Sequence, residues 1–517
     1  MENLAQEWLR LDRNPATRSE IQRLLAEKDH HGLEDRLSNR LAFGTAGLRA
    51  RMGAGFSRIN DLTIIQTSQG LASYLFREDE DVVSAGIVIG YDARHNSKHF
   101  AELAAAVFVT KGIKVWWYED LVHTPLVSYG VQSKGASAGI MISASHNPGY
   151  DNGYKVYGRG GCQINTPVDC KIADSILQNL EPITWDPQVA IASDKRICVK
   201  AELTLEYLAS LQSLFDMYHW HDSSSRTFPS FVYTPMHGVG LEFMSCALEK
   251  LGLKGATERM LIVEEQAKPD PDFPTVRYPN PEEEGALSLA KDTGDRNNVT
   301  LIIANDPDAD RLAVAEKVGG TWIQLTGDQT GILLASFILS ERVKLIEKSE
   351  IGRPMEETTV LTTAVSSSML AELASHYSVK FEETLTGFKW LGQSALEGSL
   401  QGDETLFAYE EALGYMFPSI VRDKDGIAAA CIFLAACKIW QSPYAELQRL
   451  YAQFGYYVTT NTYWRSPNVE ATSQAFERIR ASGSPHPYLV AGQRVLRWRD
   501  LTTGVLGVQG QFPRNSP

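Results

Sequence analysis

The order of apolar and polar positions predicts alternating strands and helices over most of the chain. Short apolar runs typical of buried strands lie at 86–91, 113–118, 138–142, 231–234, 259–264, 299–304, 359–362, 378–382 and 405–409. Segments with helical periodicity lie between or beside them, at 61–74, 97–111, 169–181, 203–218, 240–252, 284–293, 328–340 and 366–377. This alternation favours mostly parallel sheets covered by helices.

Length and local composition divide this pattern into units. A chain of 517 residues exceeds what one hydrophobic core supports. We expect a first domain at 1–205, a second at 206–322, a third at 323–455 and a last one at 456–517. Within the first, residues 2–38 predict two polar helices that dock through Trp8, Leu9 and Leu11.

Composition and charge narrow the functional classes. A net charge of −14 argues against a nucleic-acid backbone as partner. The six cysteines form no C-x-x-C pair, which favours free thiols in a reducing compartment. The N-terminus has no basic stretch followed by an apolar one, and the apolar run at 427–436 is too short to span a bilayer. We therefore expect a cytoplasmic protein without membrane contact; its oligomeric state stays open.

The first candidate for chemistry follows the strand at 138–142. Residues 143–148, SASHNP, are small and polar and predict a turn at the carboxyl end of that strand, where ligands bind in open α/β sheets. Ser145 and His146 lie on this turn, and Lys155 follows ten residues later, after a bend expected at Gly153. The alternative is a serine that only caps a backbone group. A serine hydrolase is disfavoured because no G-x-S-x-G elbow surrounds Ser145.

The second candidate is the segment NDPDADR at 305–311. Asp306, Asp308 and Asp310 share one face if the backbone is extended, and three such carboxylates favour a hard cation, Mg²⁺ before Ca²⁺. An EF-hand loop is excluded because Arg311 and Lys317 stand where it needs Gly and Glu. A solvated acidic loop is disfavoured by the apolar strands on both sides.

These two segments, SASHNP with NGYK and DPDADR, resemble the phosphoserine loop and the metal loop of the α-D-phosphohexomutases. The resemblance extends to FGTAGLR at 43–49, TGFKW at 386–390 and EEALGY at 410–415. With KPDPDFPTVRYPNPEE at 268–283 it points to the animal phosphoglucomutase-2 (phosphopentomutase) branch and covers about residues 1–504. It implies three similar α/β domains with mixed, largely parallel sheets around a central cleft, plus an α+β fourth domain.

The resemblance also implies a reaction and its residues. It implies a sugar-phosphate mutase in which Ser145 carries a phosphoryl group. Asp306, Asp308 and Asp310, with a phosphoryl oxygen on Ser145, would ligate Mg²⁺. Arg49 and Arg311 would neutralise phosphoryl oxygens. Lys155 would exchange a proton, aided by His146 if the pKa of that imidazole is lowered.

Further residues are implied in substrate binding: Thr386, Gly387, Lys389, Glu410, Ala412 and Lys424. Ala412 stands where the family usually has a serine, so one hydroxyl contact is lost and discrimination between sugars should relax. The expected substrates are glucose 1-phosphate and ribose or deoxyribose 1-phosphate, with glucose 1,6-bisphosphate as activator.

Two points stay open at this stage. A close relative makes glucose 1,6-bisphosphate from a three-carbon acyl phosphate, and the motifs do not separate that activity from mutase activity. The family's R-x-S-G-T-E-P loop is absent, so we expect a truncated fourth domain, and an inactive isoform that binds a partner is a further alternative. Asp92 and Arg94 are expected to hold a loop by a salt bridge.

Overall fold

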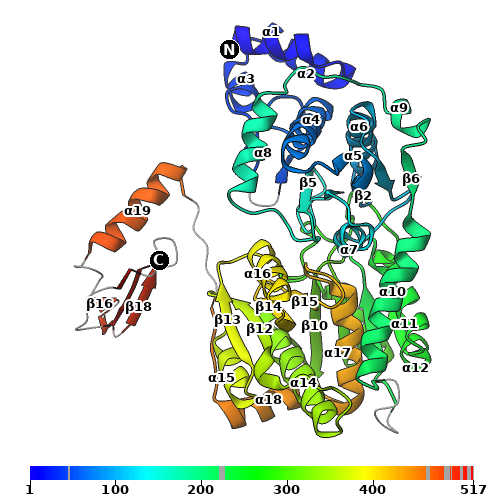
Figure 1. The fold of residues 1–517 in the computed structure, drawn as a ribbon, viewed down its shortest axis with the longest axis vertical. Coiled ribbons are helices and arrows are strands. Elements are labelled where there is room, and N and C mark those ends of the chain that lie inside the picture. The colour runs from blue at the N-terminus through cyan, green and yellow to red at the C-terminus, as the bar shows by residue number, and fades with distance from the viewer. Residues whose placement is uncertain are drawn as a thin grey trace. The chain divides into compact units, whose positions relative to one another are not determined.

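The computed structural model describes residues 1–44, 47–220, 227–460, 466–482, 489–490, 492–495, 497–500, 505–508 and 514–515. The chain contains two compact units, Met1–Tyr457 and Val458–Pro517. The larger unit holds three sheets with helices packed against them (Figure 1).

The first sheet has the order β1-β5-β4-β2-β3-β6, in which β2, β3, β4 and β6 run parallel and β5 is antiparallel to both of its neighbours. Its strands are Gly47–Arg51, Ile87–Tyr91, Val115–Trp117, Ala138–Ile142, Asp151–Gly158 and Arg196–Cys198 (β1–β6). Ile87 and Ile89 pack with helices α4 (Asp61–Glu78) and α6 (Ser97–Thr110) on one face. Val88 packs with α7 (Thr124–Lys134) and α10 (Lys200–Met217) on the other. The alternating side chains of β2 thus contribute to two cores.

Three helices precede this sheet, where two were predicted: α1 (Glu2–Leu11), α2 (Pro15–Ala26) and α3 (His30–Leu37). The third helix forms because the Asp29 side chain accepts a hydrogen bond from the Gly32 N–H and so caps its start. Trp8 and Leu11 are buried as expected, and Leu9 is half-buried. The remaining helices of this region are α5 (Val82–Ala85), α8 (Val168–Leu177) and α9 (Gln188–Ile191).

The second sheet has the order β11-β10-β9-β7-β8, with β7, β8 and β9 parallel and the β9-β10-β11 side antiparallel. Its strands are Phe231–Thr234, Met260–Ile262, Leu301–Asn305, Leu312–Val318 and Thr321–Gln324 (β7–β11). Its helices are α11 (Gly240–Lys250), α12 (Lys254–Thr257), α13 (Ser288–Asn297) and a 3₁₀ turn at Glu264–Gln266.

The third sheet has the order β13-β12-β14-β15, with β12 parallel to β13 and β14, and β15 antiparallel to β14. Its strands are Thr358–Thr363, Lys380–Thr384, Glu404–Glu410 and Gly414–Met416 (β12–β15). Its helices are α14 (Gly327–Glu347), α15 (Met369–His376), α16 (Phe388–Leu400), α17 (Gly426–Trp440), α18 (Pro443–Phe454) and a 3₁₀ turn at Met355–Glu357. The three mixed, largely parallel sheets confirm the predicted α/β class.

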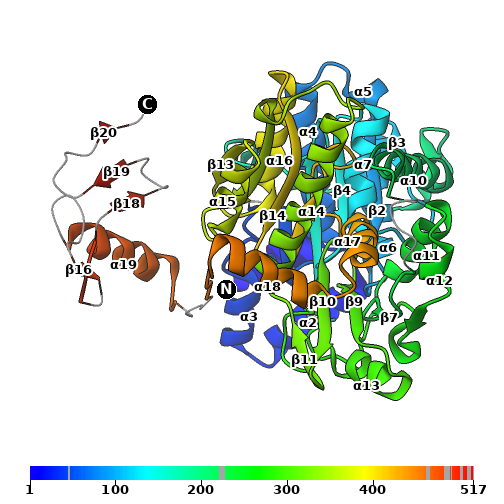
Figure 2. The same ribbon diagram turned by 90° about the horizontal axis from the view of Figure 1, so that it is seen from below.

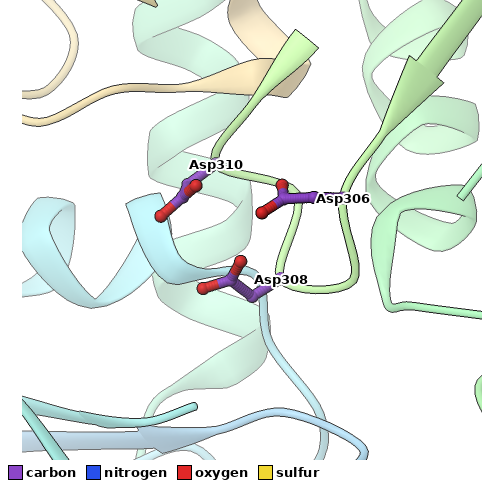
Figure 3. Close-up of side chains that lie close together, drawn as sticks. All are labelled: Asp306, Asp308 and Asp310. Atoms are coloured by element: carbon purple, nitrogen blue, oxygen red, sulfur yellow. The ribbon is translucent and has the colours of Figure 1, made fainter. Parts of the chain in front are cut away.

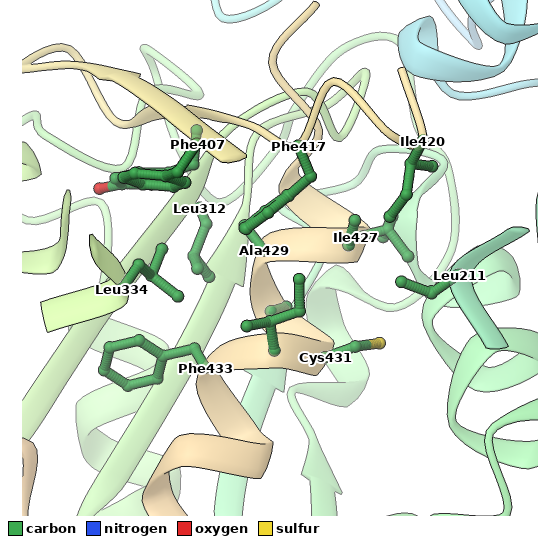
Figure 4. Packing of buried hydrophobic residues seen from close by; sticks show 14 of the residues in the cluster. Leu211, Leu312, Leu334, Phe407, Phe417, Ile420, Ile427, Ala429, Cys431 and Phe433 are labelled. Carbon is green, nitrogen blue, oxygen red and sulfur yellow. The ribbon is translucent and has the colours of Figure 1, made fainter. Parts of the chain in front are cut away.

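Helix α17 lies in the core that the second and third sheets share (Figures 2 and 4). Its residues from Gly426 to Lys438 are all buried, and Ile427 and Phe433 lie in one hydrophobic cluster with Leu312 of β10 and Phe407 of β14. None of the described helices is long and apolar enough to cross a membrane alone; α17 and α18 pass such a test only as a pair bent by 79°.

Further local features differ from the predictions. Helix α13 begins four residues after the expected start at 284. Helices α7 and α16 occupy segments for which no helix was predicted. Gly153 forms no bend: it lies in the middle of β5, where a Cβ would come within 2.3 Å of the Ser143 carbonyl oxygen, so a glycine is needed there for close strand approach.

The predicted domain boundaries stay predictions, and α10 runs without a break through residue 205. The smaller unit contains α19 (Val469–Ala481) and the short strands Leu489–Val490, Gln493–Arg494, Arg497–Asp500, Val505–Val508 and Arg514–Asn515 (β16–β20). The proposed truncation of this region stays a prediction. Residues 501–504 of the predicted fourth domain lie outside the described residues, as do Thr45 and Ala46 of the FGTAGLR segment.

Candidate active site

Polar loops occupy the same topological position in all three sheets. In each sheet a parallel strand is followed by a loop and then by an antiparallel neighbour: β4 by β5, β9 by β10 and β14 by β15. Each loop has a non-glycine residue with a left-handed backbone, Ser145 (φ 55°), Ala309 (φ 52°) and Leu413 (φ 61°). Such a conformation costs about 1–2 kcal/mol per residue, so surrounding contacts must hold these loops in place.

The loop that carries Ser145 is held by a buried guanidinium. Arg94 donates hydrogen bonds to the carbonyl oxygens of Ser145 (2.5 Å), Asn147 (2.5 Å) and Pro148 (2.8 Å). Its own charge is paired with Asp92, whose Oδ2 lies 3.4 Å from Arg94 Nε. This confirms the expected salt bridge that holds a loop, and it explains how Ser145 keeps a strained backbone.

Ser145 faces the aspartate loop. Its side chain is buried, and its Oγ donates a hydrogen bond to Asp306 Oδ2 at 2.8 Å. The Nδ1 of His146 lies 3.3 Å from the same oxygen. Burial lowers the pKa of His146 to about 2, and the charges of Arg311 and Arg49 act in the same direction. His146 is therefore a neutral imidazole here, which is the state that its predicted role needs.

Asp306, Asp308 and Asp310 converge as predicted, although the expected extended backbone is wrong. The loop turns back on itself because the Ala309 N–H bonds to the Asp306 carbonyl oxygen at 2.9 Å. All three side chains are buried, and one oxygen of each lies within 4.8 Å of the others (Figure 3). The turn, and not strand alternation, brings the three carboxylates together.

The carboxylate of Asp308 is oriented by three donors on a single oxygen. Its Oδ2 accepts hydrogen bonds from Thr124 Oγ1 (2.5 Å), Lys155 Nζ (2.6 Å) and Ser143 Oγ (3.1 Å). Its Oδ1 is buried and accepts no hydrogen bond from any described residue. One face of this carboxylate is thus satisfied, and the other is left for a ligand that the protein itself does not supply.

Asp310 repeats this arrangement. Its Oδ2 accepts from Lys155 Nζ (3.0 Å) and pairs with Lys424 Nζ (2.9 Å), whereas its Oδ1 is buried without a hydrogen-bond partner in the described part of the chain. Buried carboxylate oxygens without partners are costly unless a cation binds them. An all-oxygen set suits a hard divalent ion, so these residues fit Mg²⁺.

Burial and the surrounding charges shift the pKa values of Asp306 and Asp308 in opposite directions. Burial raises the pKa of Asp306 well above its usual range, and the nearby charges of Asp310 and Asp308 add to the increase. Burial would also raise the pKa of Asp308. However, the Lys155 charge and the hydrogen bonds from Lys155 and Thr124 outweigh burial and hold that pKa well below its usual range.

Strand pairing brings two of the predicted cations to the two candidate loops. Lys155 lies on β5 and pairs in register with Gly47 of β1, while Arg49 of β1 pairs with Gly153. The Lys155 ammonium contacts the aspartates as described above, and Arg49 donates a hydrogen bond to Asn147 Oδ1 at 3.2 Å. The short β1-β5 ladder therefore places the Arg49 side chain on the Ser145 loop and the Lys155 side chain on the metal loop.

Arg311 and Lys424 also join the aspartate loop. The backbone N–H of Arg311 donates to Asp306 Oδ1 at 3.0 Å. Burial would lower the pKa of its guanidinium, but the charges of Asp306 and Asp310 raise it. Lys424, predicted as a substrate contact, is nearly buried and is already paired with Asp310, so its contact with a sugar stays a prediction.

The other predicted substrate residues lie less tightly packed. Glu410 and Ala412 are half-buried at the turn between β14 and β15. Thr386 is exposed, Gly387 precedes α16 with φ 114°, and Lys389 lies in its first turn. In the described chain no hydrogen bond or ion pair joins Thr386, Gly387 or Lys389 to the aspartates. Their role in binding stays a prediction.

Sequence reasoning assigned no role to two residues that the fold brings to the site. Thr124 begins α7 and contacts Asp308, and Asp423 accepts hydrogen bonds from Tyr157 Oη (3.0 Å) and Gln163 Nε2 (2.9 Å) beside Lys424. The Thr-Pro pair at 124–125 is a helix-start signal that could have revealed α7. No local signal indicates that this helix begins against the metal loop.

The chain is similar to known proteins over most of its length. Family models match three segments: phosphoglucomutase/phosphomannomutase alpha/beta/alpha domain I at 40–182, domain II at 205–319 and domain III at 326–454. The "probable phosphoribomutase" of Schizosaccharomyces pombe is 44% identical over 513 residues, which span 98% of this chain and 85% of that protein. Human phosphopentomutase is 41% identical (96% and 82%), and human glucose 1,6-bisphosphate synthase is 37% identical (96% and 81%).

Solved structures share the fold at lower identity. A phosphoglucomutase/phosphomannomutase family protein from Burkholderia thailandensis has a TM-score of 0.60 at 16% identity, covering 79% of each chain. The open form of pp63/parafusin, a phosphoglucomutase from Paramecium, has a TM-score of 0.63 at 17% identity, covering 91% of this chain and 85% of that one. The three matched domains and the relatives that align over nearly the whole chain show that this protein belongs to the phosphoglucomutase/phosphomannomutase family.

Proposed function

We propose that the chain is a Mg²⁺-dependent sugar-phosphate mutase that transfers a phosphoryl group through Ser145. The observation that carries this proposal is the 2.8 Å hydrogen bond between Ser145 Oγ and Asp306 Oδ2, which sets a strained, buried hydroxyl against three converging carboxylates. A hydroxyl in that position is suited to hold a phosphoryl group whose oxygens face the metal loop.

In the proposed reaction the phosphorylated Ser145 is the donor. The bond between phosphorus and Ser145 Oγ breaks, a bond from phosphorus to a sugar hydroxyl oxygen forms, and the hydroxyl proton is transferred to Ser145 Oγ. The sugar then carries two phosphates; it turns over and returns the other one to Ser145. When bound by Asp306, Asp308 and Asp310, Mg²⁺ would supply charge neutralisation at the transferring group.

The chain's own residues position the reacting groups. Arg94 fixes the backbone of Ser145, and Arg49 and Arg311 supply guanidinium groups suited to phosphoryl oxygens. Lys155 is the proposed proton exchanger, since its ammonium lies within the same network. Neutral His146 is the proposed hydrogen-bond partner of the Ser145 hydroxyl.

The proposed substrates are ribose or deoxyribose 1-phosphate and glucose 1-phosphate, with glucose 1,6-bisphosphate as the priming activator. Relatives at 40–44% identity are named for pentose phosphates, and Ala412 lacks the hydroxyl that the family usually presents to the sugar. The cytoplasm is the proposed location.

A second candidate is glucose 1,6-bisphosphate synthesis, because relatives with that name align over 96% of the chain at 37% identity. The two activities differ in the phosphoryl donor. Product formation from glucose 1-phosphate with a three-carbon acyl phosphate, measured beside mutase turnover primed with glucose 1,6-bisphosphate, separates them. An inactive binding protein would show neither activity.

The direct test uses Ser145→Ala, with Ser137→Ala as a matched control. Ser137 is also a buried serine, but it lies directly before β4, at the opposite end of that strand from the Ser145 loop. Parent and control incubated with glucose 1,6-bisphosphate should gain a phosphoryl group by intact-mass analysis, and Ser145→Ala should not. Undiminished phosphorylation of Ser145→Ala would show that another residue is the acceptor.

A further inference from the structure

Thr124 contacts the metal loop of the second sheet, although it belongs to a helix that packs on the first sheet. It is the first residue of α7, which packs on the first sheet, whereas Asp308 follows β9 of the second sheet. Two of its groups contact the same aspartate: its backbone N–H donates to the Asp308 carbonyl oxygen (3.0 Å) and its Oγ1 donates to Asp308 Oδ2 (2.5 Å). Thr124 therefore holds both the main chain and the carboxylate of Asp308.

The hydroxyl of Thr124 also connects Asp308 with Lys155. Its proton is donated to Asp308, and its lone pair accepts a hydrogen bond from Lys155 Nζ at 3.3 Å. Thr124 is fully buried, so water does not replace these bonds. Because α7 begins here, the positive end of an eleven-residue helix also faces the carboxylate.

Neighbouring side chains fix the start of α7. His123 is fully buried, and Pro125 restricts the first turn. The His123 ring packs at a tilt against Phe243 of α11, with ring centroids 4.1 Å apart, and edge-on against Tyr207 of α10, with centroids 5.3 Å apart. Movement of Thr124 would therefore disturb aromatic packing between the first and second sheets. This packing sets the backbone position from which the Thr124 hydroxyl reaches Asp308.

We propose that Thr124 is a positioning residue that orients Asp308 toward the divalent ion. By holding Oδ2 together with Lys155 and Ser143, it leaves the unpartnered Oδ1 for the metal. Partners of this kind around metal ligands typically change metal affinity by about 10–100-fold when removed. This inference rests on the proposed function, since it assigns a role to Thr124 within the proposed Mg²⁺ site.

The test is Mn²⁺ binding followed by electron paramagnetic resonance on the full chain, with Thr124→Val and Thr124→Ser. Valine keeps the shape but removes the hydroxyl, and serine restores it. Thr124→Val should bind Mn²⁺ about tenfold or more weakly, and Thr124→Ser should stay within about threefold of the parent. Thr358→Val is the matched control, because Thr358 is equally buried but bonds to the Met355 carbonyl oxygen in the third sheet region.

The outcomes separate this inference from the proposed function. Parent-like Mn²⁺ affinity in Thr124→Val, in a protein with a parent-like melting temperature, would overturn the role of Thr124 and leave the metal site intact. A parent protein that binds no Mn²⁺ would overturn the metal site and the inference together. If Thr124→Val unfolds, Thr124→Ala decides, since it also removes the hydroxyl and a folded Thr124→Ala with unchanged affinity contradicts the inference.

Discussion

The loop after β9 and the loop after β14 have the same topological position but opposite character. Asp308 in the first is fully buried and receives three hydrogen bonds on one oxygen. Ala412 in the second is half-buried, and the neighbouring Glu410 has a buried Oε2 that pairs with no described residue. The chain thus builds its proposed transfer end before substrate arrives and leaves the proposed sugar end incomplete.

This difference has a physical reason. Transfer of a charged phosphoryl group is favoured by fixed charges and dipoles that need not reorganise during the reaction. A sugar site gains from polar groups that the substrate itself satisfies, because unpaired groups penalise the wrong ligand. Changes in the aspartate loop should therefore alter activity far more than changes in the β14–β15 loop.

The largest effect is expected for Asp308→Asn. The substitution keeps the shape but removes a charge from the proposed metal ligands and leaves the Lys155 ammonium without one partner. We expect the variant to lose several kcal/mol of transition-state stabilisation, so mutase activity should fall by orders of magnitude. Steady-state turnover is compared with Asp295→Asn, a surface carboxylate of the same sheet region paired with Lys317. Activity within about tenfold of the parent, or about 1.4 kcal/mol, would contradict a catalytic loop.

A smaller loss is expected for Arg94→Lys. Lysine keeps the charge beside Asp92 but cannot reproduce the guanidinium fork that binds the carbonyls of the Ser145 loop. Displacement of the reacting hydroxyl by about 1 Å can cost about 100-fold in rate, so the turnover number should fall by about 10–100-fold. The control is Arg342→Lys, since Arg342 is buried but pairs with Glu404 away from the site. Equal turnover in both variants would mean that the loop holds its own shape.

Glu410→Gln tests the sugar-side loop through pH. Burial raises the pKa of Glu410 from 4.5 to about 7, although the charges of Lys424 and Arg311 act against the increase, and Glu411 adds to it. The pKa of Glu410 is higher in the folded than in the unfolded protein. The contribution of Glu410 to the free energy of unfolding is therefore complete below about pH 4.5 and is lost as pH rises to about 7.

Glutamine does not titrate, so Glu410→Gln should gain stability over the parent as pH rises from 4.5 to 8. The expected gain is about 1–3 kcal/mol in unfolding free energy for a shift of this size. Melting temperatures of both proteins across this range measure it, with Glu356→Gln on the surface as control. A constant difference between variant and parent at every pH would show that Glu410 ionises normally.

The smallest effect is expected for Ala412→Ser. A neutral hydrogen bond contributes about 0.5–1.5 kcal/mol net, so the ratio of kcat/KM for glucose 1-phosphate to that for ribose 1-phosphate should rise a few-fold. Ala395→Ser, a buried alanine of α16, controls for the added hydroxyl. An unchanged ratio would mean that residue 412 does not face the sugar. The two loops would then differ in their charges and not in a contact of residue 412 with the sugar.

The sequence determined the class of fold and indicated the candidate reacting groups. Apolar strands such as 138–142 and 299–304 alternate with periodic helices, and that pattern suffices for parallel α/β sheets because burial on both faces demands it. Ser145 and the three aspartates were identifiable because polar residues directly after a buried strand have few structural reasons to be there. Arg94 could be predicted for the same reason.

Only the tertiary structure decided how these segments meet. Gly153 suggested a bend, yet it lies in a strand because pairing of β5 with β1 and β4 overrides local propensity. Thr124 and Lys424 are 184 and 114 positions from the aspartates that they contact, as their numbers and those of Asp308 and Asp310 show. Contacts at such separation depend on how three sheets pack around a shared core, and no local pattern of residues encodes that packing.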